Sequence, residues 1–281
     1  MEAQRDSTPR PPDSGARPAA SVEAWAERYL QATSIADKLE PAPPPEVWEH
    51  PQEALVIPRP GRDPALQTLE KTRRSLRRKE LESLRKRAEL FHTFLHHELQ
   101  AAELMCWALL AFPETPIAFR KGLLGICLDE IRHLELYDRW LTSRGFHYGE
   151  FAVRDWFWER VGSCRTPLQF VALMGMGLEG GNLDHTLRYA EWFREMGDQE
   201  AAQIQEQICR EEIPHVRFAI HWFRTWTGGL EFERWREEIV APLSPSLLQG
   251  KTLNRVAREA GGFDEAFLEE LITWRNGSPG S

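Results

Sequence analysis

Apolar residues recur at helical spacing through the middle of this chain. The first series runs at alternating steps of four and three residues, which places its side chains on one face of an α-helix. Its members are Phe91, Leu95, Glu98, Ala102, Met105, Leu109 and Phe112. The series predicts a long helix that begins at about residue 74 and ends before the prolines at 113 and 116. Glu98 is the charged member of an otherwise apolar face.

Three further long helices are expected at residues 117–143, 167–196 and 199–227. Each is followed by a glycine, the residue that most readily adopts the left-handed conformation past a helix C-terminus. These glycines are Gly145, Gly197 and Gly228. Shorter helices are expected at residues 22–39, 230–238, 247–260 and 263–274, and no segment shows the alternation typical of a β-strand.

The order of these helices predicts the fold class. Two helical hairpins with short turns are joined by a longer connection, residues 144–166, which is the layout of an all-α, ferritin-like four-helix bundle. We expect residues 1–20 to be a disordered tail and residues 21–73 an N-terminal arm with a short helix and a proline-rich extended segment. Residues 74–228 would form the bundle, and residues 229–281 the C-terminal helices and a tail.

The bundle contains an internal repeat of polar residues on apolar faces. Each hairpin carries a lone glutamate on its first helix and a Glu-x-x-His motif on its second, and this spacing puts both motif side chains on one face. Equivalent residues of the two halves are 81, 82 and 82 positions apart. The candidate metal ligands are Glu98, Glu130 and His133 in the first half and Glu179, Glu212 and His215 in the second.

Four carboxylates and two imidazoles are the recurring ligand set of di-iron and di-manganese carboxylate bundles. Four negative charges neutralise two divalent cations, and imidazole nitrogens suit iron and manganese. Without metal, four buried carboxylates would repel one another strongly. We therefore expect two iron ions, or manganese in their place, between the four helices. A solvated face of long charged helices is the alternative interpretation of the glutamates.

Several neighbouring polar residues leave alternatives open. Glu103 lies five residues from Glu98, about 140° round the helix, and is the less favoured ligand because it lies off the apolar face. Solvent exposure is expected for four glutamates, Glu103, Glu135, Glu206 and Glu211. Three histidines are expected to be ordinary surface residues or to form hydrogen bonds in the core. A supporting role beside the metals is the alternative for these residues, which are His97, His185 and His221.

Other residues are candidates for support of the metal site. Asp129 and Asp184 could orient the ligand histidines, since such histidines usually donate their other N–H to a carboxylate or carbonyl. Tyr137, one turn after His133, either faces the metals as a hydrogen-bond donor or is a core tyrosine with a satisfied hydroxyl. No residue beyond the metal site is predicted to be catalytic.

The third and fourth helices each contain residues that disfavour a regular helix. Pro214, between two candidate ligands, is expected to kink or bulge the fourth helix. Each glycine inside the third helix destabilises it by about 1 kcal/mol relative to alanine. Either close helix packing or a vacancy for dioxygen and substrate would account for these glycines. These glycines are Gly175, Gly177, Gly180 and Gly181.

Composition narrows the class of protein. With 281 residues, 42% of them hydrophobic, the chain can bury a full-sized core. No apolar run approaches the roughly 20 residues of a membrane-spanning helix, and the N-terminus lacks the apolar core of a signal peptide. We therefore expect no membrane association and a cytoplasmic location. The cysteines include no Cys-x-x-Cys pair, which indicates free thiols: Cys106, Cys127, Cys164 and Cys209.

Charge is distributed unevenly along the chain. The net charge is −8, but residues 71–87 hold nine Lys/Arg against two Glu. A basic stretch of this kind is usually a solvated helix face, and contact with nucleic-acid phosphates is the alternative. The segment contains no aromatic residue for base stacking, so binding of a nucleic acid is not expected.

The residues around the six candidate ligands resemble a known family. The matching stretches are His97-Glu98-Leu99-Gln100-Ala101, Asp129-Glu130 with His133, Leu178-Glu179 with Asn182-Leu183-Asp184, and Glu211-Glu212-Ile213 with His215-Val216. Over residues 21–226 the chain is similar to an uncharacterised bacterial ferritin-like family, domain-of-unknown-function family 455. The resemblance implies a ferritin-like fold and iron at the six positions, but no particular substrate. Gly180-Gly181 and Pro214 depart from the family's pattern, which bears on the shape of the pocket.

Three classes of function remain at this stage. The leading hypothesis is an enzyme, a non-haem di-iron oxygenase or oxidase that activates dioxygen to oxidise an unidentified small organic molecule, with electrons from an external donor. A tRNA-modifying hydroxylase would belong to the same class of di-iron enzyme. Iron handling by a ferroxidase or peroxidase is the second class, and a metal-free helical scaffold is the third. The complete set of six residues disfavours the scaffold. The oligomeric state is left open, with a homodimer among the options.

Overall fold

Four long helices form the body of the protein in the computed structural model, which describes residues 19–49, 53–70, 76–239 and 243–274. Most of the expected disordered tail, residues 1–18, lies outside the described residues. Within those ranges the chain is helical, and its only β-type pairing is an isolated bridge between Thr68 and Val153. The all-α prediction is confirmed.

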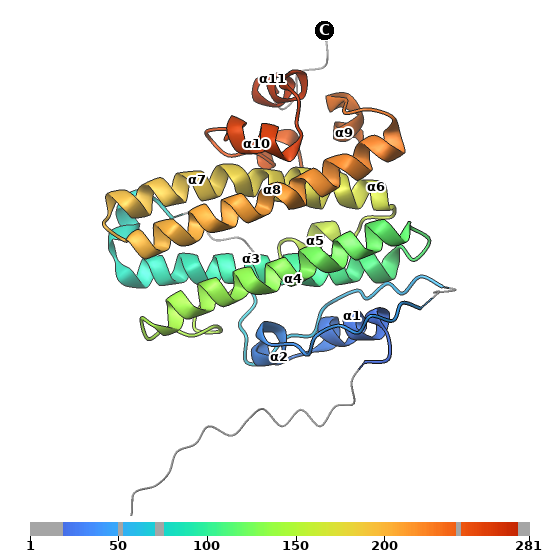
Figure 1. Cartoon of the computed structure of the whole chain (residues 1–281). Coiled ribbons are helices and arrows are strands. Elements are labelled where there is room, and N and C mark those ends of the chain that lie inside the picture. Colours follow the sequence, from blue (N-terminus) through green and yellow to red (C-terminus); the bar gives the residue numbers. More distant parts are fainter. Residues whose placement is uncertain (1–18, 50–52, 71–75, 240–242, 275–281) are drawn as a thin grey trace, which may run out of the picture.

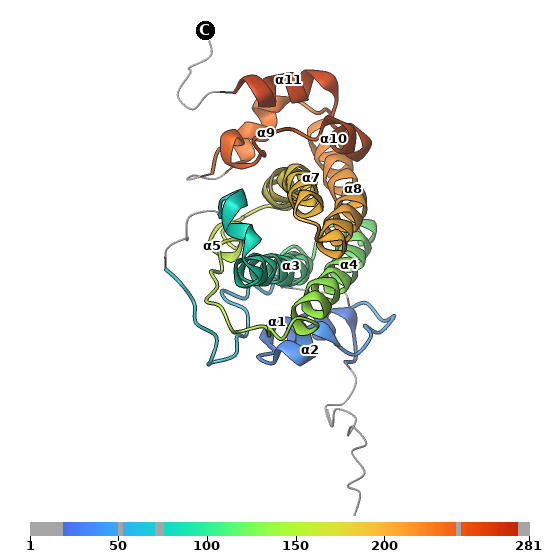
Figure 2. The same cartoon turned by 90° about the vertical axis from the view of Figure 1, so that its left-hand side faces the viewer.

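The four long helices pair as two antiparallel hairpins (Figures 1 and 2). The first hairpin consists of α3 (Leu84–Ala111) and α4 (Ile117–Thr142). The second consists of a composite third helix and α8 (Gln199–Thr227), and α4 packs against α8. Asp198 caps the start of α8 by accepting a hydrogen bond from the Ala201 amide, and Gly228 ends it at φ +83°. These caps explain why α8 has the bounds that the sequence predicts.

The third helix is not a regular α-helix. It begins as α6 (Pro167–Phe170), continues as a π-helix, η2 (Val171–Glu179), and ends as α7 (Gly180–Glu195). By contrast, α8 remains an α-helix through Pro214, which is exposed; the fourth helix was expected to kink or bulge there, and it has no bulge. A π-helical turn often marks a functional site, and here it ends at the candidate ligand Glu179.

The bundle lies between the two terminal parts of the chain (Figure 1). On one side, α1 (Val22–Gln31) and α2 (Ile35–Leu39) pack on the first hairpin. On the other side, α9 (Phe232–Glu238), α10 (Arg255–Gly261) and α11 (Glu265–Thr273) cover the second hairpin. The core is therefore continuous from the arm to the C-terminal helices.

Several predicted boundaries differ from the structure. The helix expected at residues 22–39 is broken between α1 and α2, and α3 begins at Leu84 after a short 3₁₀ turn, η1 (Arg78–Glu82). The connection between hairpins contains a short helix, α5 (Trp158–Val161). The helix expected at 247–260 reduces to α10, preceded by a 3₁₀ turn, η3 (Pro245–Leu247). Local periodicity does not mark such breaks, because packing against the bundle determines them.

Candidate metal centre

Each long helix contributes to one buried cluster of acidic and histidine side chains. Glu98 comes from α3 and Glu179 from the end of η2, while α4 and α8 each supply a glutamate and a histidine three residues apart. All six predicted side chains are 5% exposed or less, so they are withdrawn from bulk water. Such burial of charged groups is costly unless they pair or bind metal.

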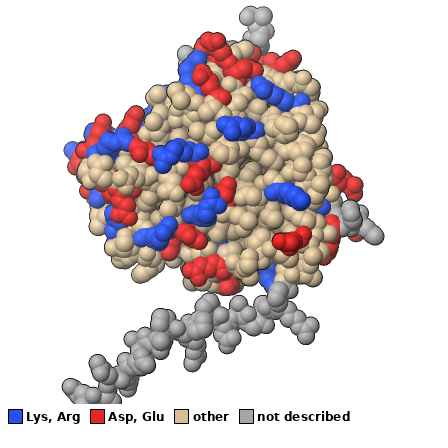
Figure 3. Space-filling model, in the orientation of Figure 1, with Lys and Arg blue, Asp and Glu red and all other residues tan. Residues whose placement is uncertain are grey.

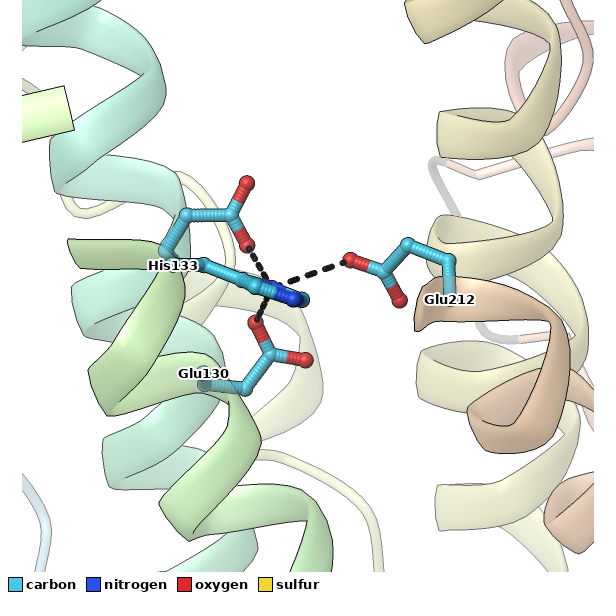
Figure 4. A group of neighbouring side chains, drawn as sticks. Glu130, His133 and Glu212 are labelled. Carbon is cyan, nitrogen blue, oxygen red and sulfur yellow. Dashed lines mark hydrogen bonds and ion pairs between the residues drawn. The ribbon is translucent and has the colours of Figure 1, made fainter. Parts of the chain in front are cut away.

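Glu130 and Glu212 lie between the two histidines. The oxygens of Glu130 are 3.1 Å from Nδ1 of His133 and 3.0 Å from Nδ1 of His215. Those of Glu212 are 3.0 Å from Nδ1 of His215 and 3.7 Å from Nδ1 of His133. Figure 4 shows the ring of His133 directed between these two carboxylates. Both carboxylates therefore lie between the two imidazoles, in a cluster that could hold a metal ion.

Glu98 and Glu179 are the two remaining candidate ligands. Glu98 is 3.8 Å from Nδ1 of His133, and one ligand atom from each of Glu98, Glu130, His133 and Glu212 lies within 4.8 Å of the others. Glu179 lies outside that group of four but lines a small cavity together with His215. Its Oε1 forms no hydrogen bond with any described residue. An unpartnered buried carboxylate oxygen fits a metal ligand, because it would otherwise be destabilising.

The Nε2 atom of each candidate ligand histidine contacts a carboxylate from the other helical hairpin. Nε2 of His133 lies 3.1 Å from Oε2 of Glu211, and Nε2 of His215 lies 3.2 Å from Oδ2 of Asp129. An Nε2–H that donates to a carboxylate leaves Nδ1 with a free lone pair facing the cluster. The prediction that Asp129 orients a histidine is confirmed. Glu211, predicted to be solvated, was missed, although it is the equivalent of Asp129 in the repeat, 82 residues on.

Asp184 does not orient a ligand histidine, so that prediction is wrong. It accepts hydrogen bonds at 2.8 Å from the amides of Gly250 and Asn254 and pairs with Arg258, with both side chains buried. Asp184 therefore fastens the C-terminal segment to α7. A neighbour of Asp184, Asn182, does reach the cluster, since its Nδ2 donates to Oε1 of Glu212 at 3.2 Å.

Glu103 is buried, contrary to the prediction that it faces solvent. Its carboxylate is 2.9 Å from Nζ of Lys38, accepts a hydrogen bond from Arg62 at 2.7 Å and accepts another from Nε1 of Trp158 at 3.0 Å. Burial alone would raise the pKa of Glu103, but Lys38 and Arg62 hold it below its usual value. Glu103 thus anchors the N-terminal arm and is not part of the candidate metal cluster, which leaves Glu98 as the candidate ligand from α3.

Tyr137 is a core tyrosine. Its buried hydroxyl accepts a hydrogen bond from Nε2 of Gln205 at 2.9 Å, and the described contacts include none between this hydroxyl and a candidate ligand. Three other histidines that the sequence singled out have no contact with the cluster among the described interactions. His97 is half-buried and stacks on Phe157 at 4.8 Å, Nδ1 of His185 lies 3.2 Å from the Arg188 guanidinium, and His221 is exposed.

In the metal-free protein, burial and neighbouring charges shift the pKa values of the cluster residues. Burial raises the pKa values of Glu98 and Glu179 well above the usual range, and neighbouring carboxylates add to the effect. Burial lowers the pKa values of His133 and His215, but the adjacent carboxylates outweigh it and raise both. The pKa of Glu130 is depressed despite burial because both imidazoliums face it. Protons on Glu98, Glu179, His133 and His215 would thus offset the negative charge that bound cations would otherwise neutralise.

The glycines of the third helix serve close packing. A β-carbon at Gly175 would overlap that of Ala219 on α8, and one at Gly181 would lie 3.3 Å from the carbonyl oxygen of Leu248. Gly175 also lines the cavity beside Glu179 and His215, which has a volume of about 10 Å³ and otherwise apolar walls that include Phe170 and Phe218. A cavity of this size holds one water-sized molecule, so the glycines leave no room for a large substrate there.

The basic segment is largely neutralised where it is described. Arg78 pairs with Glu195 at 2.6 Å, Arg85 with Glu150 at 3.0 Å, and Arg87 with Asp198 at 3.1 Å. Residues 71–75 lie outside the described residues. On the face in Figure 3, basic and acidic side chains are interspersed rather than gathered by sign.

Across the described part of the chain, none of the helices has the length and apolar character needed to cross a bilayer.

Comparison with known proteins identifies the family. Residues 8–269 match the family described as "Protein of unknown function (DUF455)", and the chain belongs to it. An uncharacterised protein of Haemophilus influenzae is 28% identical over 156 residues, which make up 54% of each chain. The similar region thus spans about half the length of that relative. No solved structure matches the chain.

Proposed function

We propose that this member of the DUF455 family is an oxidoreductase, a non-haem oxidase or oxygenase with two iron or manganese ions. The ligands would be Glu98, Glu130, His133, Glu179, Glu212 and His215. The observation that carries the proposal is the two-fold arrangement in which both Nδ1 atoms face the same pair of carboxylates while both Nε2 atoms are held by acids. Four carboxylates and two imidazoles match the charge and hardness of two such divalent cations.

The side chains have separate tasks in this proposal. Glu130 and Glu212, which lie between the two histidines, would hold the cations together with Glu98 and Glu179. Asp129 and Glu211 would fix the tautomer and direction of the histidines. The surrounding apolar residues would exclude water, which strengthens the electrostatic attraction between the carboxylates and the cations. The bound metals would supply the electrons for the reduction of dioxygen.

The small cavity beside the cluster favours a second candidate function that also uses bound iron. The space beside Glu179 and His215, about 10 Å³, is water-sized and too small for an organic substrate. A ferroxidase or peroxidase, which needs no organic substrate, therefore stands beside the oxygenase. Oxygen uptake with and without excess ferrous iron would distinguish them, because a ferroxidase turns over with iron alone.

Metal content tests the proposal directly. We expect about two metal ions per chain after anaerobic loading with ferrous iron and desalting, as measured by elemental analysis. The Glu130→Ala/His133→Ala variant should lose most of this metal. The control is Glu135→Ala/His221→Ala, which removes an exposed acid from α4 and an exposed histidine from α8. Near-zero metal in the unaltered protein would contradict the proposal and leave a helical scaffold as the better account.

A further inference from the structure

Two cysteines face each other in the core of the first hairpin. Sγ of Cys106 on α3 lies 3.4 Å from Sγ of Cys127 on α4, and the two residues are 1% and 0% exposed. A disulfide bond would bring these two sulfurs to about 2.05 Å from each other. The other two thiols are elsewhere, with Cys164 buried in the connection between hairpins and Cys209 half-buried on α8.

The thiol pair lies next to the candidate metal cluster. Cys127 precedes Glu130 by three residues on α4, a spacing that leaves about 5–6 Å between Cβ atoms. Cys106 follows Glu103 by three residues on α3, and Tyr29 of α1 is close enough to both thiols for them to raise its pKa further above the value set by burial. The pair therefore lies between the metal cluster and the N-terminal arm.

The environment of the pair restricts what could oxidise it. Solvent-borne oxidants react with exposed thiolates, whereas buried thiols are normally inert. Burial raises the pKa of Cys127, and the neighbouring Cys106 and Glu130 raise it further. Oxidation by direct attack from solvent is thus disfavoured, while a redox centre one helical turn away would be within reach.

We propose that Cys106 and Cys127 form a redox-active dithiol that supplies two electrons through the metal site for the reduction of dioxygen. The inference rests on the proposed function. In the reaction, each thiol loses a proton and an electron, an S–S bond forms, and dioxygen takes up the two electrons and two protons to become hydrogen peroxide. A pair of cysteines that merely fills the core as small apolar residues would stay reduced throughout.

Thiol counting tests the inference by a readout other than activity. The protein is loaded with ferrous iron without oxygen, exposed to air, denatured in a thiol-alkylating reagent and analysed by mass spectrometry. We expect two of the four thiols to escape alkylation, with one peptide pair joined through Cys106 and Cys127. The same protein without metal, and the Glu130→Ala/His133→Ala variant, should keep four alkylated thiols over the same time.

Matched variants locate the reacting pair. Cys164→Ser/Cys209→Ser should still form the disulfide, whereas Cys127→Ala should form none while still binding metal. Four alkylated thiols in a protein that binds iron and consumes dioxygen would overturn the inference and leave the proposed function intact. Equal disulfide formation in the metal-free protein would also overturn it. A protein that binds no metal would contradict both proposals.

Discussion

Glu211 on α8 reaches across the bundle to hold Nε2 of His133 on α4, at 3.1 Å. Asp129, the residue before Glu130 on α4, does the same for His215 on α8 at 3.2 Å. Each hairpin therefore orients the histidine of the other. This reciprocity ties the geometry of both candidate metal positions to the packing of α4 against α8.

Removal of one orienting acid should weaken metal binding without unfolding the protein. We expect Glu211→Ala to lower the affinity for ferrous iron by about 10- to 100-fold, because His133 would lose the partner that fixes its ring and tautomer. Competition with a chelator of known affinity would measure the change. Glu135→Ala, which removes an exposed acid from α4, is the control and should bind as the unaltered protein does. Equal affinity of both variants would show that Glu211 does not support the site.

Metal uptake should release protons and grow tighter as the pH rises. The pKa values of Glu98, Glu179, His133 and His215 are all raised in the metal-free protein, so these groups hold protons that two cations must displace. Higher pH removes those protons beforehand, and the apparent Kd should therefore fall. Titration with metal in weakly buffered solution containing an indicator dye would count the protons. An affinity for metal that does not change with pH would contradict this account.

The buried ion pair between Asp184 and Arg258 should contribute strongly to stability. Arg258→Ala leaves the Asp184 carboxylate buried without its cation, and we expect a loss of about 3–5 kcal/mol in the free energy of unfolding. Arg255→Ala is the matched control on the same helix, because Arg255 is only partly buried and its ion pair with Glu269 is worth about 0–1 kcal/mol. Urea denaturation followed by circular dichroism would compare them. Similar midpoints for the two variants would show that the C-terminal segment is held by other contacts.

Two glycine substitutions should change stability in opposite directions. Gly175→Ala places a methyl group against Ala219 and should destabilise by about 1–3 kcal/mol. Gly125→Ala adds a methyl group on α4 where no atom lies within 4 Å, and it should stabilise by up to about 1 kcal/mol because alanine favours the helix. Thermal unfolding of both variants checks the signs. A stabilising Gly175→Ala would mean that the third and fourth helices separate readily at this point.

The sequence by itself determined the helical framework and the membership of the buried cluster. Periodicity and capping glycines located the four long helices, and α8 begins and ends where the pattern predicts. The repeat of Glu and Glu-x-x-His identified six side chains that the fold brings together. These features are readable because they depend on local spacing, which fixes the face of a helix on which a residue lies. The same repeat would have identified Glu211 as the counterpart of Asp129.

Only the tertiary structure decided which polar residues meet across elements. Glu103 lies on a face that the helix period leaves outside, yet the N-terminal arm buries it and supplies Lys38 and Arg62. Asp184 pairs with Arg258 because the C-terminal helices fold back over α7. The π-helix that ends at Glu179 likewise has no local signature. Burial, ion pairing and helix distortion depend on segments far apart in the chain, and their cost or benefit arises only when those segments pack together.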